Sequence, residues 1–111
     1  MGLFSWDCEV CGHALLSHEA TQEKNGWMTD AVAIERDGSV LCGGYDGYGR
    51  LNDRELERPQ VYHKRCWQLA GKPTEFVKES HNSNDQGWFF DDDAHNYAPP
   101  KTIEDAKKIK S

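Results

Sequence analysis

The stretch VYHKRCW, at residues 61–67, places His63 and Cys66 three positions apart. Cys8 and Cys11, near the start of the chain, have the same spacing. Together the two pairs give C-x2-C, a long gap and then H-x2-C. Tetrahedral zinc prefers four nitrogen and sulfur ligands, and three thiolates with one imidazole form a common structural set. The pattern therefore predicts one structural zinc site.

The composition indicates a small domain with little aliphatic core. The chain has 111 residues and a net charge of −6, and its mean hydropathy is −0.85. Leu, Ile, Val and Phe together fall below the roughly 20% under which a charged chain is suspected of disorder. Four Trp, four Tyr and four Phe can anchor a compact region. A bound zinc would add stability, since it contributes about 10–16 kcal/mol to the folding of small finger peptides.

The N-terminus MGLFSWDCEV lacks the basic start and long apolar run of a secretory signal. The chain also has no apolar window of about 18 residues that could span a membrane. We therefore expect an intracellular protein, cytoplasmic or nuclear. In that setting four cysteines are more typical of metal ligands than of two disulfides.

A β-hairpin is predicted over residues 31–42, with Asp37-Gly38 as a two-residue turn between two apolar runs. This turn sets the predicted cross-strand pairs, which are Ile34 with Leu41 and Ala33 with Cys42. A second Asp-Gly pair, at 46–47, leads either into a short strand at 48–51 or into a glycine-rich loop.

Two short helices are predicted. The stretch HKRCWQLAG begins at His63, and Gly71 is placed to end the helix, with Pro73 just beyond it. The second helix covers residues 102–110, with Thr102 as its N-cap. The elements predict the α+β class.

In its order of turn, hairpin and helix, the sequence resembles the treble-clef zinc fingers, of which LIM-type modules are one branch. The resemblance covers roughly residues 6–71. It rests on Cys8-Glu9-Val10-Cys11-Gly12 and on His63-Lys64-Arg65-Cys66. It implies a zinc knuckle, a β-hairpin or three-stranded meander, and a short helix. It also implies that the knuckle and the first helical turn each supply two ligands: Cys8, Cys11, His63 and Cys66. The chain departs from simple members in its long gap between the ligand pairs.

We expect two regions: a zinc-binding module at 1–72 and a C-terminal extension at 73–111. The extension is mostly polar and irregular, but it holds the aromatic strip GWFF at 87–90. This strip either folds back to cover the small core or stays free as a motif for a partner.

Two residues offer alternative ligands. His13 makes C-x2-C-x-H with the first pair, and Cys42 could replace His63 to give a site of four cysteines. A structural thiol is the more common meaning of a cysteine placed like Cys42.

Other candidate sites are weaker. The stretch from Asn82 to Asp93 approaches a calcium loop, but the loop requires Asp first, Glu last and flanking helices. The Gly-rich stretch 43–49 lacks the lysine of a phosphate loop. A catalytic Cys42 would need a free histidine base, and four ligands leave a zinc ion no open position. The sequence therefore does not predict an enzyme.

Acidic charge and many aromatic residues favour contact with another protein, as an adaptor or accessory module. The alternative is a zinc finger that binds nucleic acid, RNA more than duplex DNA. Basic residues for that role cluster only at Lys64-Arg65 and at 107–110.

Overall fold

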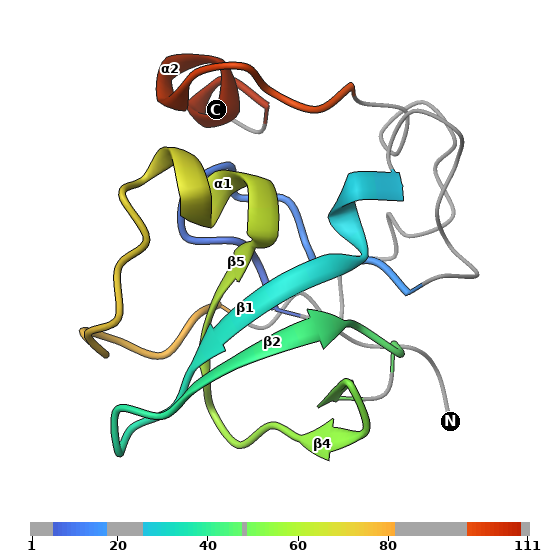
Figure 1. Cartoon of the computed structure of the whole chain (residues 1–111), viewed down its shortest axis with the longest axis vertical. Coiled ribbons are helices and arrows are strands. Elements are labelled where there is room, and N and C mark those ends of the chain that lie inside the picture. The colour runs from blue at the N-terminus through green and yellow to red at the C-terminus, as the bar shows by residue number, and fades with distance from the viewer. Residues whose placement is uncertain (1–5, 18–25, 48, 82–97, 110–111) are drawn as a thin grey trace.

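The computed structural model describes residues 6–17, 26–47, 49–81 and 98–109. It is a small compact α+β protein, as predicted (Figure 1). The elements follow one another as η2 (Gly26–Met28), β1 (Asp30–Ile34), β2 (Val40–Gly44), β3 (Arg50–Leu51), β4 (Arg54–Glu55), β5 (Gln60–His63), α1 (Lys64–Leu69) and α2 (Ile103–Lys107).

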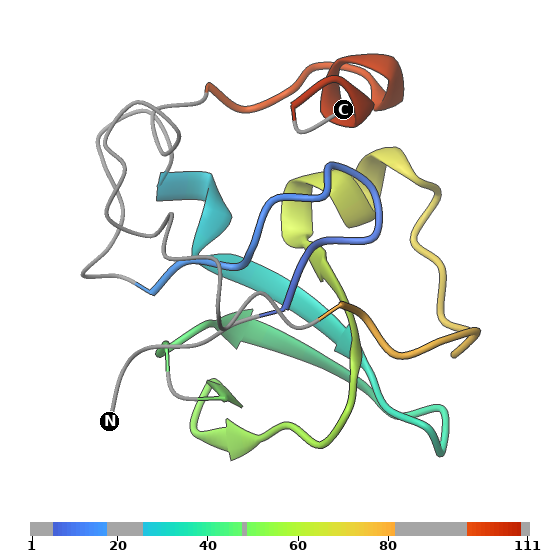
Figure 2. The same cartoon turned by 180° about the vertical axis from the view of Figure 1, so that it is seen from behind.

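The main sheet has three antiparallel strands in the order β2-β1-β5, so the buried strand β1 lies in the middle. Helix α1 follows β5 directly, and α2 lies beyond α1 at the end of the molecule away from β4 (Figures 1 and 2). The short strands β3 and β4 form a separate hairpin. Its turn residues, Asn52 and Asp53, both have positive φ, as a tight two-residue turn requires.

The predicted hairpin is present, but its register differs by one residue. Ile34 pairs with Val40, and Ala33 pairs with Leu41. The prediction of a two-residue turn was wrong, because the loop has three residues. Glu35 N donates to Ser39 O, and Gly38 N donates to Glu35 O. Gly38 has φ 91°. A type I turn followed by a left-handed glycine is the usual geometry of such a loop.

The one-residue difference changes which side chains share a face. Cys42 pairs with Val32 and lies on the Ile34 face, while Leu41 lies with Ala33 on the other. The predicted grouping of Cys42 with Ala33 was therefore wrong.

Strand β5 was not predicted. It is short and leads directly into α1. All four of its residues are buried, so the strand lacks the alternation of polar and apolar side chains by which a strand is predicted. The glycine-rich stretch does lead into a short strand, β3, through an isolated bridge between Tyr45 and Leu51. Of the two alternatives for this stretch, the strand is the one observed, over residues 50–51.

Both predicted helices form. Helix α1 ends where Gly71, at φ 91°, bends the chain away, and Gly71 N donates to Gln68 O. In α2, Thr102 Oγ1 accepts a hydrogen bond of 3.1 Å from Asp105 N. This is the predicted cap.

The sheet separates two apolar clusters. On one face, Ala31 and Ala33 pack with Trp6, Tyr45 and Leu51, under the segment that carries β3 and β4. On the other face, the residues packed together are Ile34, Tyr62, Cys8, Cys11, Cys66 and, from α2, Ala106. The second cluster contains the three candidate cysteine ligands, and His63 is also fully buried, so the candidate metal site is part of the core.

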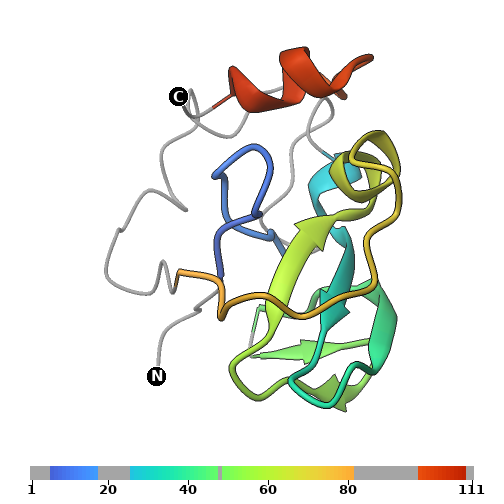
Figure 3. The same ribbon diagram turned by 90° about the vertical axis from the view of Figure 1, so that its left-hand side faces the viewer.

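Residues 75–81, called the strap below, cross the outer side of β5 near its start (Figure 3). Ser80 N donates to Pro59 O, and the Gln60 carbonyl oxygen Oε1 accepts from Val77 N and Lys78 N. The first part of the C-terminal extension is therefore packed on the N-terminal module. The boundary at residue 72 stays a prediction.

Candidate metal centre

Four residues converge at one end of the sheet: Cys8, Cys11, His63 and Cys66. Their ligand atoms all lie within 4.8 Å of one another, and all four residues are buried. The first two come from the turn before β1. His63 is the last residue of β5 and the N-cap of α1, and Cys66 lies in the first turn of that helix. The spacing of three residues places both side chains of each pair on one side of the backbone.

The turn that carries Cys8 and Cys11 is held by its own backbone. Gly12 N donates to Cys8 O at 3.0 Å, and Cys8 N donates to His13 O at 2.9 Å. Gly12 has φ 77°, which a residue with a Cβ adopts only with strain. Val10 N lies 3.4 Å from Cys8 Sγ and donates to it. This turn, residues 8–13, is called the knuckle below.

The ring of His63 is oriented by a contact on its far side. Nδ1 lies 3.3 Å from Cys11 Sγ, and Nε2 lies 3.1 Å from the carbonyl oxygen of Ala14. A carbonyl oxygen only accepts, so Nε2 carries the proton and Nδ1 keeps its lone pair toward the sulfur atoms. Trp27 packs edge-on against the ring, with centroids 5.0 Å apart.

The three thiols do not titrate alike. Burial raises the pKa of Cys8, but hydrogen bonds with Cys11, Cys66 and His63 outweigh it and leave that pKa well below its usual value. Hydrogen bonding with Cys66 and Cys8, together with burial, raises the pKa of Cys11. For Cys66, the hydrogen bond with Cys11 lowers the pKa. The hydrogen bond with Cys8 and burial outweigh this effect, so the pKa of Cys66 is raised overall.

The donor set fits a metal ion. Three sulfur atoms and one ring nitrogen converge in a buried space, and His63 N donates to Cys8 Sγ at 3.4 Å. Backbone donors to sulfur and a carbonyl acceptor behind the imidazole are the outer contacts that usually orient metal ligands. The four residues are close enough to hold one metal ion, which is compatible with a single structural zinc.

Neither alternative ligand belongs to this group. His13 is fully buried, but its Nδ1 lies 3.0 Å from Ala14 O, and its ring centroid is 6.3 Å from that of His63. Cys42 is exposed on β2, so its interpretation as a buried structural thiol was wrong.

The remaining sequence candidates do not form sites in the described residues. The calcium-like stretch 82–93 and the aromatic strip 87–90 lie outside them. In the glycine-rich stretch, Asp46 accepts from Arg50 N at 3.1 Å and from Arg50 Nε at 2.7 Å. Its carboxylate stabilises the turn, and a carboxylate repels phosphate.

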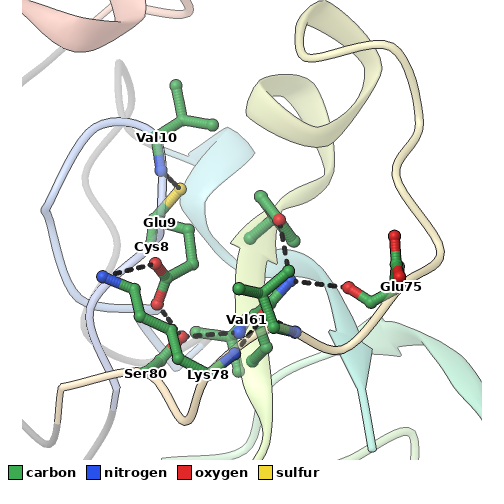
Figure 4. A network of polar contacts seen from close by, with 10 residues as sticks. Cys8, Glu9, Val10, Val61, Glu75, Lys78 and Ser80 are labelled. Atoms are coloured by element: carbon green, nitrogen blue, oxygen red, sulfur yellow. Dashed lines mark hydrogen bonds and ion pairs between the residues drawn. The ribbon is translucent and has the colours of Figure 1, made fainter. Parts of the chain in front are cut away.

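Sequence reasoning missed the contacts that surround the ligands. The carbonyl of Ala14 gives no sequence signal, because every residue has one. Ser80 and Glu9 lie side by side next to β5, and Ser80 Oγ donates to Glu9 Oε2 (Figure 4). They are 71 positions apart, and no spacing rule pairs them.

No protein-family model, curated protein or solved structure matches this chain. None of the helices in the described ranges has the length and apolar character needed to cross a membrane.

Proposed function

We propose that this chain is a structural-zinc module that acts by contact with another protein, in an adaptor or accessory role. The observation that carries the zinc assignment is the convergence of Cys8, Cys11, His63 and Cys66 within 4.8 Å. Thiolate and imidazole are the ligands that zinc takes in structural sites, whereas magnesium and calcium take oxygen.

The closed donor set supports a structural metal. A catalytic zinc keeps one position for water or substrate. Here four protein donors account for all four tetrahedral positions, and the most exposed of the four residues, Cys8, has only 3% of its surface accessible. A zinc ion in this site would connect the knuckle to α1 and stabilise the face of the sheet between them.

The treble-clef resemblance is part of the proposal. A knuckle, a hairpin and a helix that begins at the second ligand pair occur in the order that this architecture uses. Strand β5 adds an element between the hairpin and the helix, and β1 lies in the middle of the sheet.

The protein-contact role rests on charge and on the absence of an open metal position. The net charge of −6 disfavours a polyanion as the main partner. A surface groove lined by more carboxylates than guanidinium groups offers a place where another chain could bind.

Binding to RNA is a second candidate, favoured by one specific contact. Arg65 Nε donates to Pro100 O at 2.7 Å, which holds α1 against the segment that carries Lys101. Helix α2, which carries Lys107, also packs on α1. Basic residues that are far apart in the sequence therefore gather around the two helices.

Elemental analysis of protein purified without added metal tests the zinc assignment, and the expected ratio is one zinc per chain. Fluorescence anisotropy with single-stranded RNA and duplex DNA at physiological salt then separates the two partner classes. Weak or absent binding to both supports a protein partner. Sub-micromolar binding to either would move the function to nucleic acid.

A further inference from the structure

The two outer edges of the three-stranded sheet differ. On β5, the outward-facing N–H of Val61 donates to Ser80 Oγ at 2.8 Å, and its carbonyl accepts from Glu9 N at 3.0 Å. The next outward-facing N–H, that of His63, donates to Cys8 Sγ. The strap and the knuckle therefore close this edge (Figure 4).

The opposite edge is β2, and the hairpin hydrogen bonds fix which of its groups face outward. Glu35 N donates to Ser39 O at 2.8 Å across the hairpin. In an antiparallel pair, bonded and non-bonded positions alternate. The N–H and C=O groups of Val40 and Cys42 therefore point away from β1.

Among the described residues, only the far end of this edge receives a backbone hydrogen bond from another part of the chain. Asn52 N donates to the outward-facing carbonyl of Gly44 at 3.1 Å. Across the described ranges, no other backbone hydrogen bond reaches Val40 or Cys42 from outside the hairpin. Val40 is half-buried and Cys42 is exposed. An edge strand with such groups is a template for pairing with another chain.

An acidic groove of about 880 Å³ lies beside this edge, on the face that carries Ser39 and Leu41. The groove also runs along residues 53–58, which include β4. Its carboxylates outnumber its guanidinium groups by five to three, and they belong to Glu35, Asp37, Asp53, Glu55 and Glu57.

The negative charge of the groove is only partly compensated. Arg36, one of the three arginines, forms its ion pair with Glu79 of the strap, at 3.8 Å. Burial, together with the neighbouring Asp37 carboxylate, raises the pKa of Glu35. The excess of carboxylates over guanidinium groups, and the contribution of Asp37 to that shift, indicate that the groove would favour a cation.

We propose that the β2 edge at Val40 and Cys42 binds an extended segment of a partner protein that carries Lys or Arg at alternate positions. The segment would add a fourth strand to the sheet by backbone hydrogen bonds. Alternate side chains of a strand point to opposite faces. One set would therefore point to the Leu41 face and meet the carboxylates, and the other set would lie beside Val40. This proposal names the surface for the proposed protein contact and rests on that role, but it does not depend on which metal is bound.

The test uses the full-length zinc-bound chain and a short peptide of alternating lysine and valine. We expect the peptide to shift the amide NMR signals of Val40 and Cys42 and to slow their hydrogen exchange. A matched peptide of alternating glutamate and valine should have no effect. Binding of both peptides, or of neither, would overturn the proposal.

Val40→Pro removes an outward N–H that β1 does not use, so the hairpin should still form. It should weaken binding of the lysine peptide about tenfold, the effect of losing one good hydrogen bond. A Glu55→Gln, Glu57→Gln double variant should also weaken binding, whereas Glu104→Gln on α2 should not. Unchanged affinity in both groove and edge variants would contradict the proposal.

Two results with the free protein would also overturn it. The amides of Val40 and Cys42 could already be protected by the chain itself, or the protein could dimerise through this edge. Zinc content is measured on the same samples. If a folded, zinc-bound protein does not bind the peptide, only this proposal is disproved. If the protein is folded without metal, the zinc assignment is disproved.

Discussion

Nε2 of His63 lies 3.1 Å from the carbonyl oxygen of Ala14, on the side of the ring opposite Cys11. The hydrogen bond fixes the tautomer in which Nδ1 is unprotonated and faces the sulfur atoms. Ala14 directly follows the knuckle, so the segment that supplies two thiols also orients the imidazole. The backbone itself therefore orders this candidate ligand set.

Removal of the metal should unfold the domain, because binding and folding are linked. We expect a strong chelator to lower the melting temperature sharply and to broaden the transition seen by circular dichroism. Added zinc should restore it. A chain freed of metal that still melts sharply at the original temperature would contradict a structural role for the ion.

Cys66→Ser and Cys42→Ser should behave differently. Cys66 is fully buried in the cluster, so its loss should abolish stoichiometric zinc binding and unfold the core. Cys42 is exposed, so its substitution should change the free energy of unfolding by less than about 0.5 kcal/mol and leave zinc bound. Metal analysis and urea unfolding of the two variants provide the check. Equal loss of metal from both would mean that the ligand set is misassigned.

The convergence of the four candidate ligands could be predicted because they form two short-range pairs. Each pair needs only three positions of chain, and local turn or helix geometry then brings both donors to one side. The identical spacing of the two pairs also indicated that both could share one ion. The caps at Gly71 and Thr102 were predictable for the same reason, since they depend on neighbouring residues.

The remaining features are not decided by the local sequence pattern. Asp37-Gly38 fits both a two-residue and a three-residue loop, and only the observed bonds at Glu35 and Ser39 decide the register. Strand β5 exists because β1 has a free side for it to pair with. The strap is polar and irregular, and its attachment at Gln60 and Ser80 cannot be deduced from any local pattern.

Substitutions of the two histidines near Ala14 should have clearly different effects on zinc binding. His63→Ala removes a ligand and should abolish tight zinc binding. His13→Ala should keep zinc, and we expect a loss of about 1–3 kcal/mol in unfolding free energy, because a buried polar contact to Ala14 O is removed. Cobalt substitution gives the readout, since ligand loss changes its visible spectrum. Loss of the cobalt spectrum in His13→Ala would make His13 a ligand.

Gly43 and Gly44 offer a matched pair on β2. A Cβ at Gly43 would lie 2.5 Å from Cβ of Asn52, and its φ of 151° is unfavourable for other residues. Gly43→Ala should therefore cost about 1–3 kcal/mol or more, as overpacking does. A Cβ at Gly44 would meet only Thr29 Cγ2, at 3.7 Å, so Gly44→Ala should fold normally. Urea unfolding measures both, and equal stability of the two would contradict the close packing of β2 against the β3–β4 turn.

Ser80 tests whether the strap is part of the folded domain. Its hydroxyl accepts from Val61 N and donates to Glu9, which also pairs with Lys78 at 3.6 Å. Ser80→Ala would leave the buried N–H of Val61 without its partner, at a cost of about 1–3 kcal/mol. Val61 N should then exchange its hydrogen faster than in the original protein.

Lys78→Ala is the control, because the Lys78 side chain is 70% exposed and an exposed ion pair contributes about 0–1 kcal/mol. Zinc should stay bound in both variants, since neither residue is a ligand. If Ser80→Ala and Lys78→Ala are equally stable and Val61 N stays protected, something other than the strap closes the β5 edge. In that case the strap could no longer be used to distinguish a closed β5 edge from an open β2 edge.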